Sequence, residues 1–235
     1  MVHSSKTNLA SQYGVVLLAG GKSSRMGTNK ALLPILGKPN IEHIRDQLRS
    51  LVPAPDERGA SPHFVVVTNE PESYRFLGET MVGDRHPGLG PLAGIQVGLQ
   101  ASPCDWNLVV ACDMPMVTAE VGLFLMELAG ADRSANEEPT GFDAVVPVIG
   151  GQLHPLFAVY HKRCANPIEE MLLSSKLRMI YLLDSLRVKQ VTEADFPNHI
   201  NIGQVFFNMN NPEDYQQVLK WLSEGGRKRE VFPGS

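Results

Sequence analysis

The residues best suited to chemistry lie in one glycine-rich, basic segment that directly follows the apolar run 14–19. Glycine lets the backbone approach a ligand closely, so that its N–H groups can reach an anion. Backbone N–H groups combined with several cations suit a polyphosphate better than a single carboxylate. The segment interleaves three glycines with three cations: Gly20, Gly21, Lys22, Arg25, Gly27 and Lys30.

Two familiar phosphate-binding motifs do not fit this segment. A P-loop that ended at Gly21-Lys22-Ser23 would need glycine at position 16, where the chain has Val16. The dinucleotide fingerprint G-x-G-x-x-G needs a residue between its first two glycines, and here Gly20 and Gly21 are adjacent. The segment therefore indicates either another kind of polyphosphate site or a glycine turn that carries solvated basic side chains.

A carboxylate ends a second apolar run. Asp113 follows the run 109–112, and Pro115 stops the strand from continuing. If this end lies at the same sheet edge as the glycine segment, Asp113 can hold Mg²⁺, which takes one or two protein carboxylates and completes its shell with phosphate and water oxygens. The alternative is an aspartate that forms a turn or caps a helix. Earlier in the chain, Gly90-Pro91 opens a helix whose first N–H groups can receive an anion.

Short apolar runs alternate with amphipathic stretches, and this order predicts the elements that position these residues. It favours an α/β fold: a Rossmann-like three-layer sandwich with a mainly parallel central sheet and helices on both faces. We expect strands at 14–19, 64–68, 79–82, 106–112, 142–148, 156–160, 188–191 and 205–207, and helices at 40–52 (with Asn40 as N-cap), 71–77, 91–101, 118–129, 165–173, 178–183 and 212–223.

The composition excludes several classes of protein. Of the 235 residues, 43% are apolar and 20% charged, as in ordinary globular proteins. The formal net charge of −4 offers no electrostatic basis for binding nucleic acid or an anionic membrane. No apolar run approaches the roughly 18 residues that a membrane span needs.

The chain ends and the cysteines indicate the domain limits and the location of the protein. Residues 1–13 form a polar N-terminal extension without the apolar core of a secretory signal. We expect a single domain over 14–224 and a flexible tail over 225–235. The three widely spaced cysteines match no zinc pattern and favour a cytoplasmic location.

The string Leu-Ala-Gly-Gly-x-Ser-x-Arg-Met-Gly at 18–27, followed by Lys30, resembles the signature of nucleotidyltransferases that activate small phosphorylated molecules. Within that superfamily it is similar to the molybdenum cofactor guanylyltransferases, the MobA-like family, which couple GTP to molybdopterin. Related cytidylyltransferases more often read Leu-Ala-Ala-Gly, so Gly20-Gly21 favours guanine. The chain departs from the family at Asn29, where an acidic residue usually precedes the lysine.

The resemblance implies roles for individual residues. It makes Arg25, Lys30 and Asp113 the catalytic residues and Asp113 the ligand of Mg²⁺, the expected cofactor. It places Asn69 near the guanine and makes Asp84 a nucleotide contact. The nucleotide-binding set that it implies is Leu18, Ala19, Gly20, Gly21, Lys22, Ser23, Lys30, Asn69, Asp84 and Asp113.

Two later segments extend the resemblance. His154-Pro155 looks like the family's His-Pro segment, where the pterin is expected, although a single histidine before proline is also a common turn residue. The stretch 208–214 is similar to the family's Asn-x-Asn-Thr-Pro-Glu-Asp signature, so Asn208 or Asn210 could approach the metal. The same stretch could simply cap the last helix. Arg178 either faces the substrate phosphate or is an exposed helical arginine.

The reaction implied is transfer of GMP from GTP to the terminal phosphate of molybdopterin, with release of pyrophosphate. GTP and molybdopterin are then the small-molecule partners, and transient contacts with proteins that deliver or accept the cofactor are expected. Two alternatives stay open. One is a cytidylyltransferase, or another sugar- or alcohol-phosphate nucleotidyltransferase of the same fold. The other is a nucleotide-binding regulatory module without catalysis.

Overall fold

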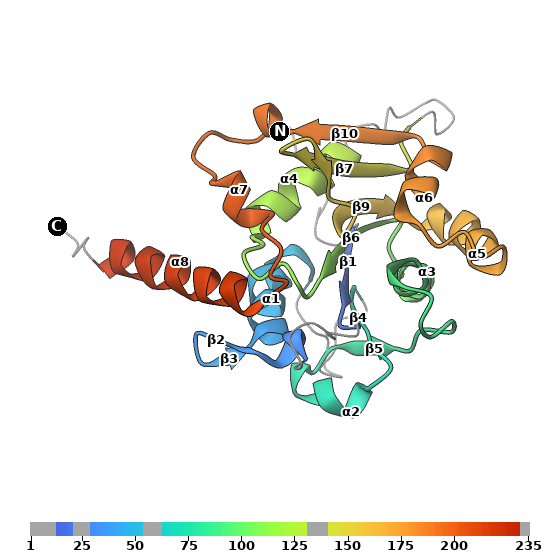
Figure 1. Cartoon of the computed structure of the whole chain (residues 1–235). Coiled ribbons are helices and arrows are strands. Elements are labelled where there is room, and N and C mark those ends of the chain that lie inside the picture. The colour runs from blue at the N-terminus through green and yellow to red at the C-terminus, as the bar shows by residue number, and fades with distance from the viewer. Residues whose placement is uncertain (1–12, 21–28, 54–62, 131–140, 231–235) are drawn as a thin grey trace, which may run out of the picture.

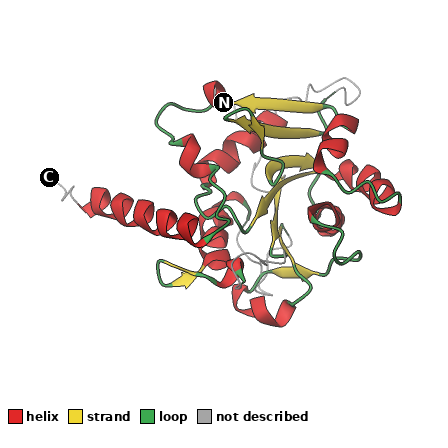
Figure 2. Ribbon diagram, viewed as in Figure 1, coloured by secondary structure: helices red, strands yellow, loops and turns green. Residues whose placement is uncertain are grey.

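A computed structural model describes residues 13–20, 29–53, 63–130 and 141–230, the last six of these by their backbone alone. The described residues form an eight-stranded sheet flanked by helices (Figures 1 and 2). Its strands are β1 (Tyr13–Leu18), β4 (Phe64–Val67), β5 (Thr80–Val82), β6 (Trp106–Ala111), β7 (Ala144–Ile149), β8 (Gln152–Leu153), β9 (Phe157–His161) and β10 (Val188–Thr192). Their order across the sheet is β10-β7-β9-β6-β1-β4-β5, and β8 pairs with β7.

The order of the strands produces a switch point beside β1. This strand is parallel to β4 on one side and to β6 on the other, and β4 is parallel to β5. The chain therefore moves outward from β1 first in one direction and later in the other. In open α/β sheets such a reversal leaves a crevice at the carboxyl ends of the two strands, where ligands bind.

Helices cover both faces of the sheet, which gives three layers. Helices α1 (Asn40–Leu48) and α4 (Ala119–Gly130) lie on one face, and α3 (Pro91–Ala101), α5 (Ala165–Leu173) and α6 (Met179–Ser185) lie on the other (Figure 1). Alternate residues of β1 pack into the two cores, Val15 and Leu17 with α1 and α4, Val16 and Leu18 with α3. The predicted three-layer α/β sandwich with helices on both faces is confirmed.

One glycine allows α3 to lie close to the sheet. A Cβ added to Gly98 would stand 2.3 Å from Cγ1 of Val16. With any other residue at this position, either α3 or β1 would have to shift to relieve the clash. This packing matters for the site because the loop before α3 reaches the carboxyl ends of the strands.

The later strands depart from a purely parallel sheet. After β7 the chain makes a two-residue turn at Gly150 and Gly151, whose φ angles are +59° and +73°, and returns as β8. Positive φ at both residues is the backbone of a type I′ hairpin turn. The chain then runs through β9 antiparallel to β6 and β7. As a result, the start of β9 lies at the carboxyl end of β6, where Phe157 is opposite Val110.

The strand expected at 205–207 is wrong. The chain forms a helical turn there instead, α7 (Ile202–Val205), which Asn201 caps by accepting the N–H of Gln204. The next residue, Phe206, is buried in a cluster of aromatic rings with Phe157 and Phe196, at centroid distances of 5.0 and 5.9 Å. The apolar run therefore packs against the sheet from outside instead of adding a strand to it.

Asn40 does not cap α1, contrary to expectation. Pro39 occupies the N-cap position, where its side chain makes no capping hydrogen bond, and Asn40 is the first residue of the helix. Asn40 is fully buried, so its side chain points into the protein. The short α2 (Pro71–Tyr74), by contrast, begins with proline in its first turn as expected.

The last helix is longer than expected and extends away from the sheet. α8 (Pro212–Glu230) continues past the expected end at 223, and Figure 1 shows its far end projecting from the body of the molecule. Its first turns pack on a small hairpin of β2 (Pro34–Ile35) and β3 (Lys38–Pro39), where the Tyr215 hydroxyl donates to the Pro34 carbonyl at 2.6 Å. Within the described ranges, no helix is long and apolar enough to cross a bilayer.

Candidate active site

The candidate site lies at the carboxyl ends of β1, β4 and β6, which backbone hydrogen bonds join beyond the strands themselves. The Ala19 N–H donates to the Val67 carbonyl at 3.0 Å, and the Cys112 N–H donates to the Leu18 carbonyl at 3.2 Å. Leu18 and Ala19 are buried, whereas Gly20 is exposed. The chain therefore leaves β1 for the glycine-rich segment directly beside the residue that precedes Asp113.

Lys30, the last cation of that segment, begins a 3₁₀ turn, Lys30–Leu32. Asn29 caps the turn, because its Oδ1 accepts the N–H of Ala31 at 3.0 Å. The Lys30 ammonium donates to Oδ1 of Asn210 at 2.9 Å. This bond connects the start of the chain to the segment that precedes α8, so the tertiary fold sets the position of the amine.

Asp113 follows β6 and is half-buried. One carboxylate oxygen, Oδ1, is shielded from solvent and has no hydrogen-bond partner among the described residues. Burial raises the pKa of Asp113, and the positive charge of Lys30 acts in the opposite direction. The two charged groups therefore lie within electrostatic reach of each other, at one edge of the sheet. The Asp113 carbonyl also accepts the Met209 N–H at 2.7 Å.

These residues fit a magnesium ion. A buried carboxylate oxygen without a partner is destabilising unless something supplies positive charge, and a divalent cation does so. The described residues contain no group of three or more His, Cys, Asp or Glu arranged to hold a metal. One protein carboxylate is enough for Mg²⁺ when phosphate oxygens and waters complete its shell. Asn208 is half-buried nearby in sequence, and Asn210 is bound to Lys30.

Asn29, which departs from the family pattern, takes part in a chain of hydrogen bonds. Its Nδ2 donates to the Tyr74 hydroxyl at 2.8 Å, and that hydroxyl donates to the Ala19 carbonyl at 3.3 Å. Ala19 and Asn29 lie on either side of the segment 21–28 in the sequence, and buried Tyr74 of α2 binds both. A carboxylate at position 29 could not donate to the phenol oxygen, so the amide fixes the direction in which Tyr74 donates.

A second polar pair lies at the ends of β4 and β5. Oδ1 of Asn69 accepts the Asp84 N–H at 2.8 Å, and the Asp84 carboxylate accepts the His86 N–H at 2.7 Å. The His86 ring nitrogen lies 3.4 Å from the Glu169 carboxylate on α5. The structure thus brings Asn69 and Asp84 together, at the same sheet edge as Lys30.

The structure also places the later candidates. Because β9 runs antiparallel, the turn at His154 lies beside the end of β6, where the Ala111 N–H donates to the Leu156 carbonyl at 2.9 Å. The His154 ring packs against Phe206 at a centroid distance of 5.0 Å, and burial lowers its pKa. Arg178 precedes α6, is exposed, and lies 5.7 Å from the centre of the Tyr181 ring.

The motif before the last helix does cap that helix. Oδ1 of Asn211 accepts the Asp214 N–H at 2.8 Å, and the Asp214 carboxylate accepts the N–H groups of Asn210 and Asn211 at 2.7 and 3.1 Å. This reciprocal pattern is that of a capping box. Capping and the contact of Asn210 with Lys30 coexist, because the cap uses the backbone of Asn210 and leaves its side chain for the lysine.

Sequence reasoning missed Asn40 as part of this region. Its amide donates to the carbonyls of Lys30 and Cys112, at 3.2 and 2.7 Å. Nothing in the pattern before α1 indicates this, because an asparagine after proline is typical of a helix start. Four predicted residues of the glycine-rich segment, Gly21, Lys22, Ser23 and Arg25, lie outside the described residues.

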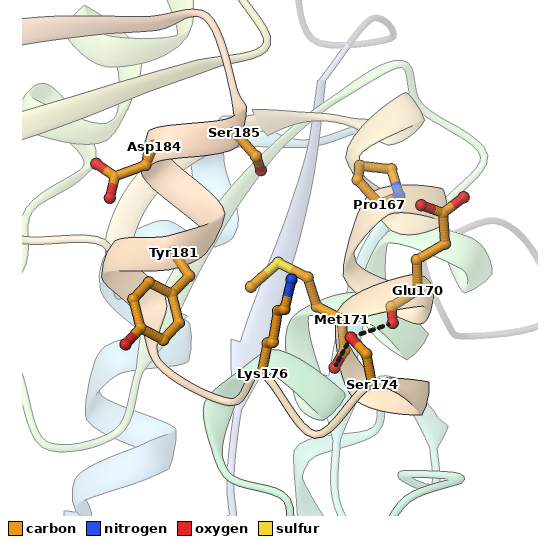
Figure 3. Close-up of a pocket in the computed structure, with 8 residues that line it drawn as sticks. All are labelled: Pro167, Glu170, Met171, Ser174, Lys176, Tyr181, Asp184 and Ser185. Carbon is orange, nitrogen blue, oxygen red and sulfur yellow. Dashed lines mark hydrogen bonds between the residues drawn. The ribbon is translucent and has the colours of Figure 1, made fainter.

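A separate hollow lies between α5 and α6 (Figure 3). Figure 3 shows Tyr181 and Asp184 of α6 on one side and Pro167 and Glu170 of α5 on the other. The hollow is open to solvent, and the Ser174 hydroxyl there donates to the carbonyls of its own helix. It contains none of the predicted site residues, so it belongs to the outer surface of the helical layer and not to the strand edge.

The chain is similar in sequence to known proteins. A family model described as the MobA-like NTP transferase domain matches residues 15–190. A probable molybdenum cofactor guanylyltransferase of Carboxydothermus hydrogenoformans is 34% identical over 209 residues, which cover 89% of this chain and 96% of that protein. Another, of Pelotomaculum thermopropionicum, is 35% identical over 217 residues, covering 92% of this chain and 96% of that protein.

Solved structures show the same architecture. The molybdopterin-guanine dinucleotide biosynthesis protein A of Archaeoglobus fulgidus superposes with a TM-score of 0.73 at 25% identity, covering 90% of this chain and 99% of that one. A CMP:2-keto-3-deoxy-manno-octonic acid synthetase complexed with CTP has a TM-score of 0.65 at 13% identity, covering 92% and 100%, and shares the fold alone. The chain belongs to the MobA-like NTP transferase family and is an enzyme of the nucleotidyltransferase type.

Proposed function

We propose that the protein transfers GMP from GTP to the terminal phosphate of molybdopterin and releases pyrophosphate. Relatives that share about a third of its residues over most of the chain are named as probable molybdenum cofactor guanylyltransferases. The observation that carries the proposal is the shared position of Lys30 and Asp113. The Lys30 ammonium binds Asn210 and the Asp113 carbonyl binds the adjacent Met209, so the ammonium and the buried carboxylate oxygen lie in the same region, at the switch point of the sheet.

The reaction needs alignment and charge neutralisation more than proton transfer. An oxygen of the acceptor phosphate attacks the α-phosphorus of GTP in line. A new P–O bond forms, and the bond from the α-phosphorus to the oxygen bridging it to the β-phosphate breaks, so that pyrophosphate carries the electron pair away. A phosphate monoester has its second pKa near ~6 and is largely dianionic at neutral pH, so it attacks without a general base. No histidine is required for this step.

Different residues of the chain would neutralise charge and hold the metal ion. Lys30 would neutralise negative charge on the triphosphate and on the departing pyrophosphate, with Lys22 and Arg25 in the same role. Asp113 would hold Mg²⁺, which supplies positive charge to the phosphate oxygens. The dense anionic charge of the substrate and the single protein carboxylate are compatible with such an ion.

The remaining predicted residues would bind the nucleotide. The backbone of Leu18, Ala19, Gly20 and Gly21, with Ser23, would border the base and phosphates. Asn69 and Asp84 would contact the nucleoside from the ends of β4 and β5, where their own backbone contacts hold them in place. The turn at His154 would line the pterin side, because it lies beside β6 at the same edge.

A pyrophosphate-release assay tests the proposal. The purified protein is incubated with Mg²⁺ and each of the four nucleoside triphosphates, with and without molybdopterin. Release with GTP that depends on molybdopterin is the expected result. Release with CTP instead would assign a cytidylyltransferase of the same fold. Tight GTP binding without any release would favour a non-catalytic nucleotide-binding module and overturn the proposal.

Two further expectations accompany the proposed reaction. Molybdopterin is unstable in solution, so we propose transient contacts with proteins that deliver it or accept the product. We also propose a cytoplasmic location, because the three cysteines are all free thiols.

A further inference from the structure

Asn40 is a buried asparagine that binds two distant parts of the candidate site. Its side chain is completely inaccessible to solvent. Its Nδ2 group donates to the Cys112 carbonyl at 2.7 Å and to the Lys30 carbonyl at 3.2 Å. Its own backbone N–H donates to the Leu33 carbonyl at 2.8 Å, so Asn40 is itself held by the turn that carries Lys30.

The chemistry of the partners fixes the orientation of this amide. Both partners are carbonyl oxygens, which only accept hydrogen bonds, so the NH₂ group must face them. The other end of the amide, Oδ1, is buried without a partner among the described residues. A buried acceptor without a donor is destabilising. The asparagine side chain therefore contributes through its two N–H donors and not through its carbonyl oxygen.

Helix capping does not account for the residue. Asn40 lies inside α1, and its side chain faces the strand ends, not the free N–H groups of the helix. The two carbonyls that it binds belong to the two segments that present the charged groups. One is the carbonyl of Lys30 itself, and the other belongs to the peptide group that leads into Asp113.

We propose that Asn40 is a positioning residue that fixes the Lys30 segment against the Asp113 segment. The inference rests on the proposed function for its catalytic consequence. A single rigid amide between two backbone carbonyls limits how far the ammonium and the carboxylate can move relative to each other. Reactions that depend on alignment are sensitive to such movement, since a displacement of about 1 Å can reduce the rate about 100-fold.

The chain offers a matched control in Asn107, at the opposite end of β6. Asn107 is also fully buried, its Nδ2 also donates to a backbone carbonyl, that of Cys104 at 3.0 Å, and its Oδ1 also lacks a partner in the described part of the chain. It differs in position, because it lies at the amino end of the strand, away from the charged groups. Asn40→Leu and Asn107→Leu therefore remove the same kind of interaction, hydrogen bonds from a buried amide to backbone carbonyls, at two different places.

Steady-state kinetics of pyrophosphate release is the first measurement. We expect Asn40→Leu to lower kcat by about 10- to 100-fold while KM for GTP changes less than about threefold, because alignment and not binding is lost. Asn107→Leu should lower the thermal midpoint but keep kcat within about twofold. In a Lys30→Ala background, Asn40→Leu should reduce kcat by no more than about threefold further, because residues that act together are not additive.

Hydrogen–deuterium exchange gives a readout that does not depend on activity. In Asn40→Leu, peptides that contain 30–33 and 112–114 should exchange about tenfold faster, while β4 keeps its protection. Asn107→Leu should leave both peptides unchanged. Should Asn40→Leu not fold, Asn40→Ala takes its place in the same measurements.

The outcomes are separable. If the wild type releases no pyrophosphate with any nucleotide, the proposed function fails, and exchange alone decides whether Asn40 holds the two segments. Unchanged exchange at 30–33 and 112–114 overturns the inference. So does a kcat within twofold of the wild type, or an effect of Asn40→Leu that is equally large in the Lys30→Ala background.

Discussion

The two halves of the candidate site are assembled in different ways. The half with Lys30 and Asp113 depends on bonds between residues far apart in the chain, such as the one from Lys30 to Asn210. It also contains a buried carboxylate oxygen without a partner among the described residues. The half with Asn69 and Asp84 depends on bonds between residues closer in the chain, is more exposed, and satisfies its polar groups with nearby backbone N–H groups.

This difference separates two kinds of contribution to function. Local turns can place polar groups for binding at little energetic cost, because water can replace a lost partner. A buried carboxylate oxygen that lacks a hydrogen-bond partner lowers the stability of the fold. Such an oxygen is expected where a site must interact with a charged ligand or ion. We therefore expect substitutions in the first half to affect the chemical step and substitutions in the second to affect binding.

The largest effect is expected at Asp113. Asp113→Ala and Asp113→Asn should both fold and lower kcat by about 100- to 1,000-fold, the loss typical of one charge-stabilising group. Because burial raises the pKa of this carboxyl, its ionised form destabilises the folded protein, and Asp113→Asn should raise the thermal midpoint at neutral pH. Pyrophosphate release and thermal unfolding measure the two effects.

Asp143 is the contrasting carboxylate. Burial acts to raise its pKa, but hydrogen bonds from Arg187 and Arg163 outweigh this and lower it. Asp143→Asn should therefore lower the thermal midpoint, because removing one partner of an ion pair is destabilising. It should leave kcat within about twofold, because Asp143 lies away from the candidate site. A destabilised Asp113→Asn with normal turnover would contradict the comparison.

Lys30→Ala should produce a loss of similar or slightly smaller size. We expect kcat to fall by about 100-fold, since the ammonium would stabilise charge that develops on the leaving group. The fold should survive, because the amine donates to an exposed asparagine side chain, that of Asn210. Lys38, whose amine pairs with Asp46 at 2.6 Å on the outer surface of the hairpin, provides the control. Turnover in Lys38→Ala should equal that of the wild type.

Asp84→Ala should have a smaller effect of another kind. We expect KM for GTP to rise by about tenfold with kcat changed less than threefold, the pattern of a lost binding contact. The measurement is a GTP titration at saturating molybdopterin. Glu72, an exposed carboxylate paired with Arg75 on α2, is the matched control. A fall in kcat with KM unchanged would place Asp84 with Lys30 and Asp113 in the catalytic half.

Much of this arrangement could be predicted from sequence, for a physical reason. Lys30 and Asp113 are 83 positions apart, but each follows an apolar run, and the carboxyl ends of parallel strands meet at one edge. Sequence patterns that depend only on this geometry of parallel strands therefore predict the structure well. The resemblance added Asn69 and Asp84, and the structure brings those two together as well.

The features that were missed depend on particular tertiary contacts. Asn40 looks like a helix cap until the carbonyls of Lys30 and Cys112 are placed beside it. The run 205–207 has the composition of a strand, and packing against Phe157 decides its conformation instead. The antiparallel β9 did leave a signal, because adjacent glycines between two apolar runs, here Gly150 and Gly151, indicate a hairpin.

The smallest effect is expected at His154, and it concerns stability. Burial lowers the pKa of its imidazole, and a hydrogen bond with the Ile149 backbone acts in the opposite direction. The unfolded chain therefore binds a proton more readily than the folded protein. As the pH falls from about 7 through the unfolded value of about 6.5 toward the lower folded value, the free energy of unfolding must fall.

His154→Phe removes this titration and keeps a ring against Phe206. Denaturant unfolding from about pH 7 to about pH 5 should then show a shallower loss of stability than the wild type. Part of the slope should remain, because burial also lowers the pKa of His43. Normal turnover in this variant would agree with a chemical step that needs no histidine. Loss of kcat with an unchanged stability profile would instead place His154 among the catalytic residues. The catalytic half would then extend across β9.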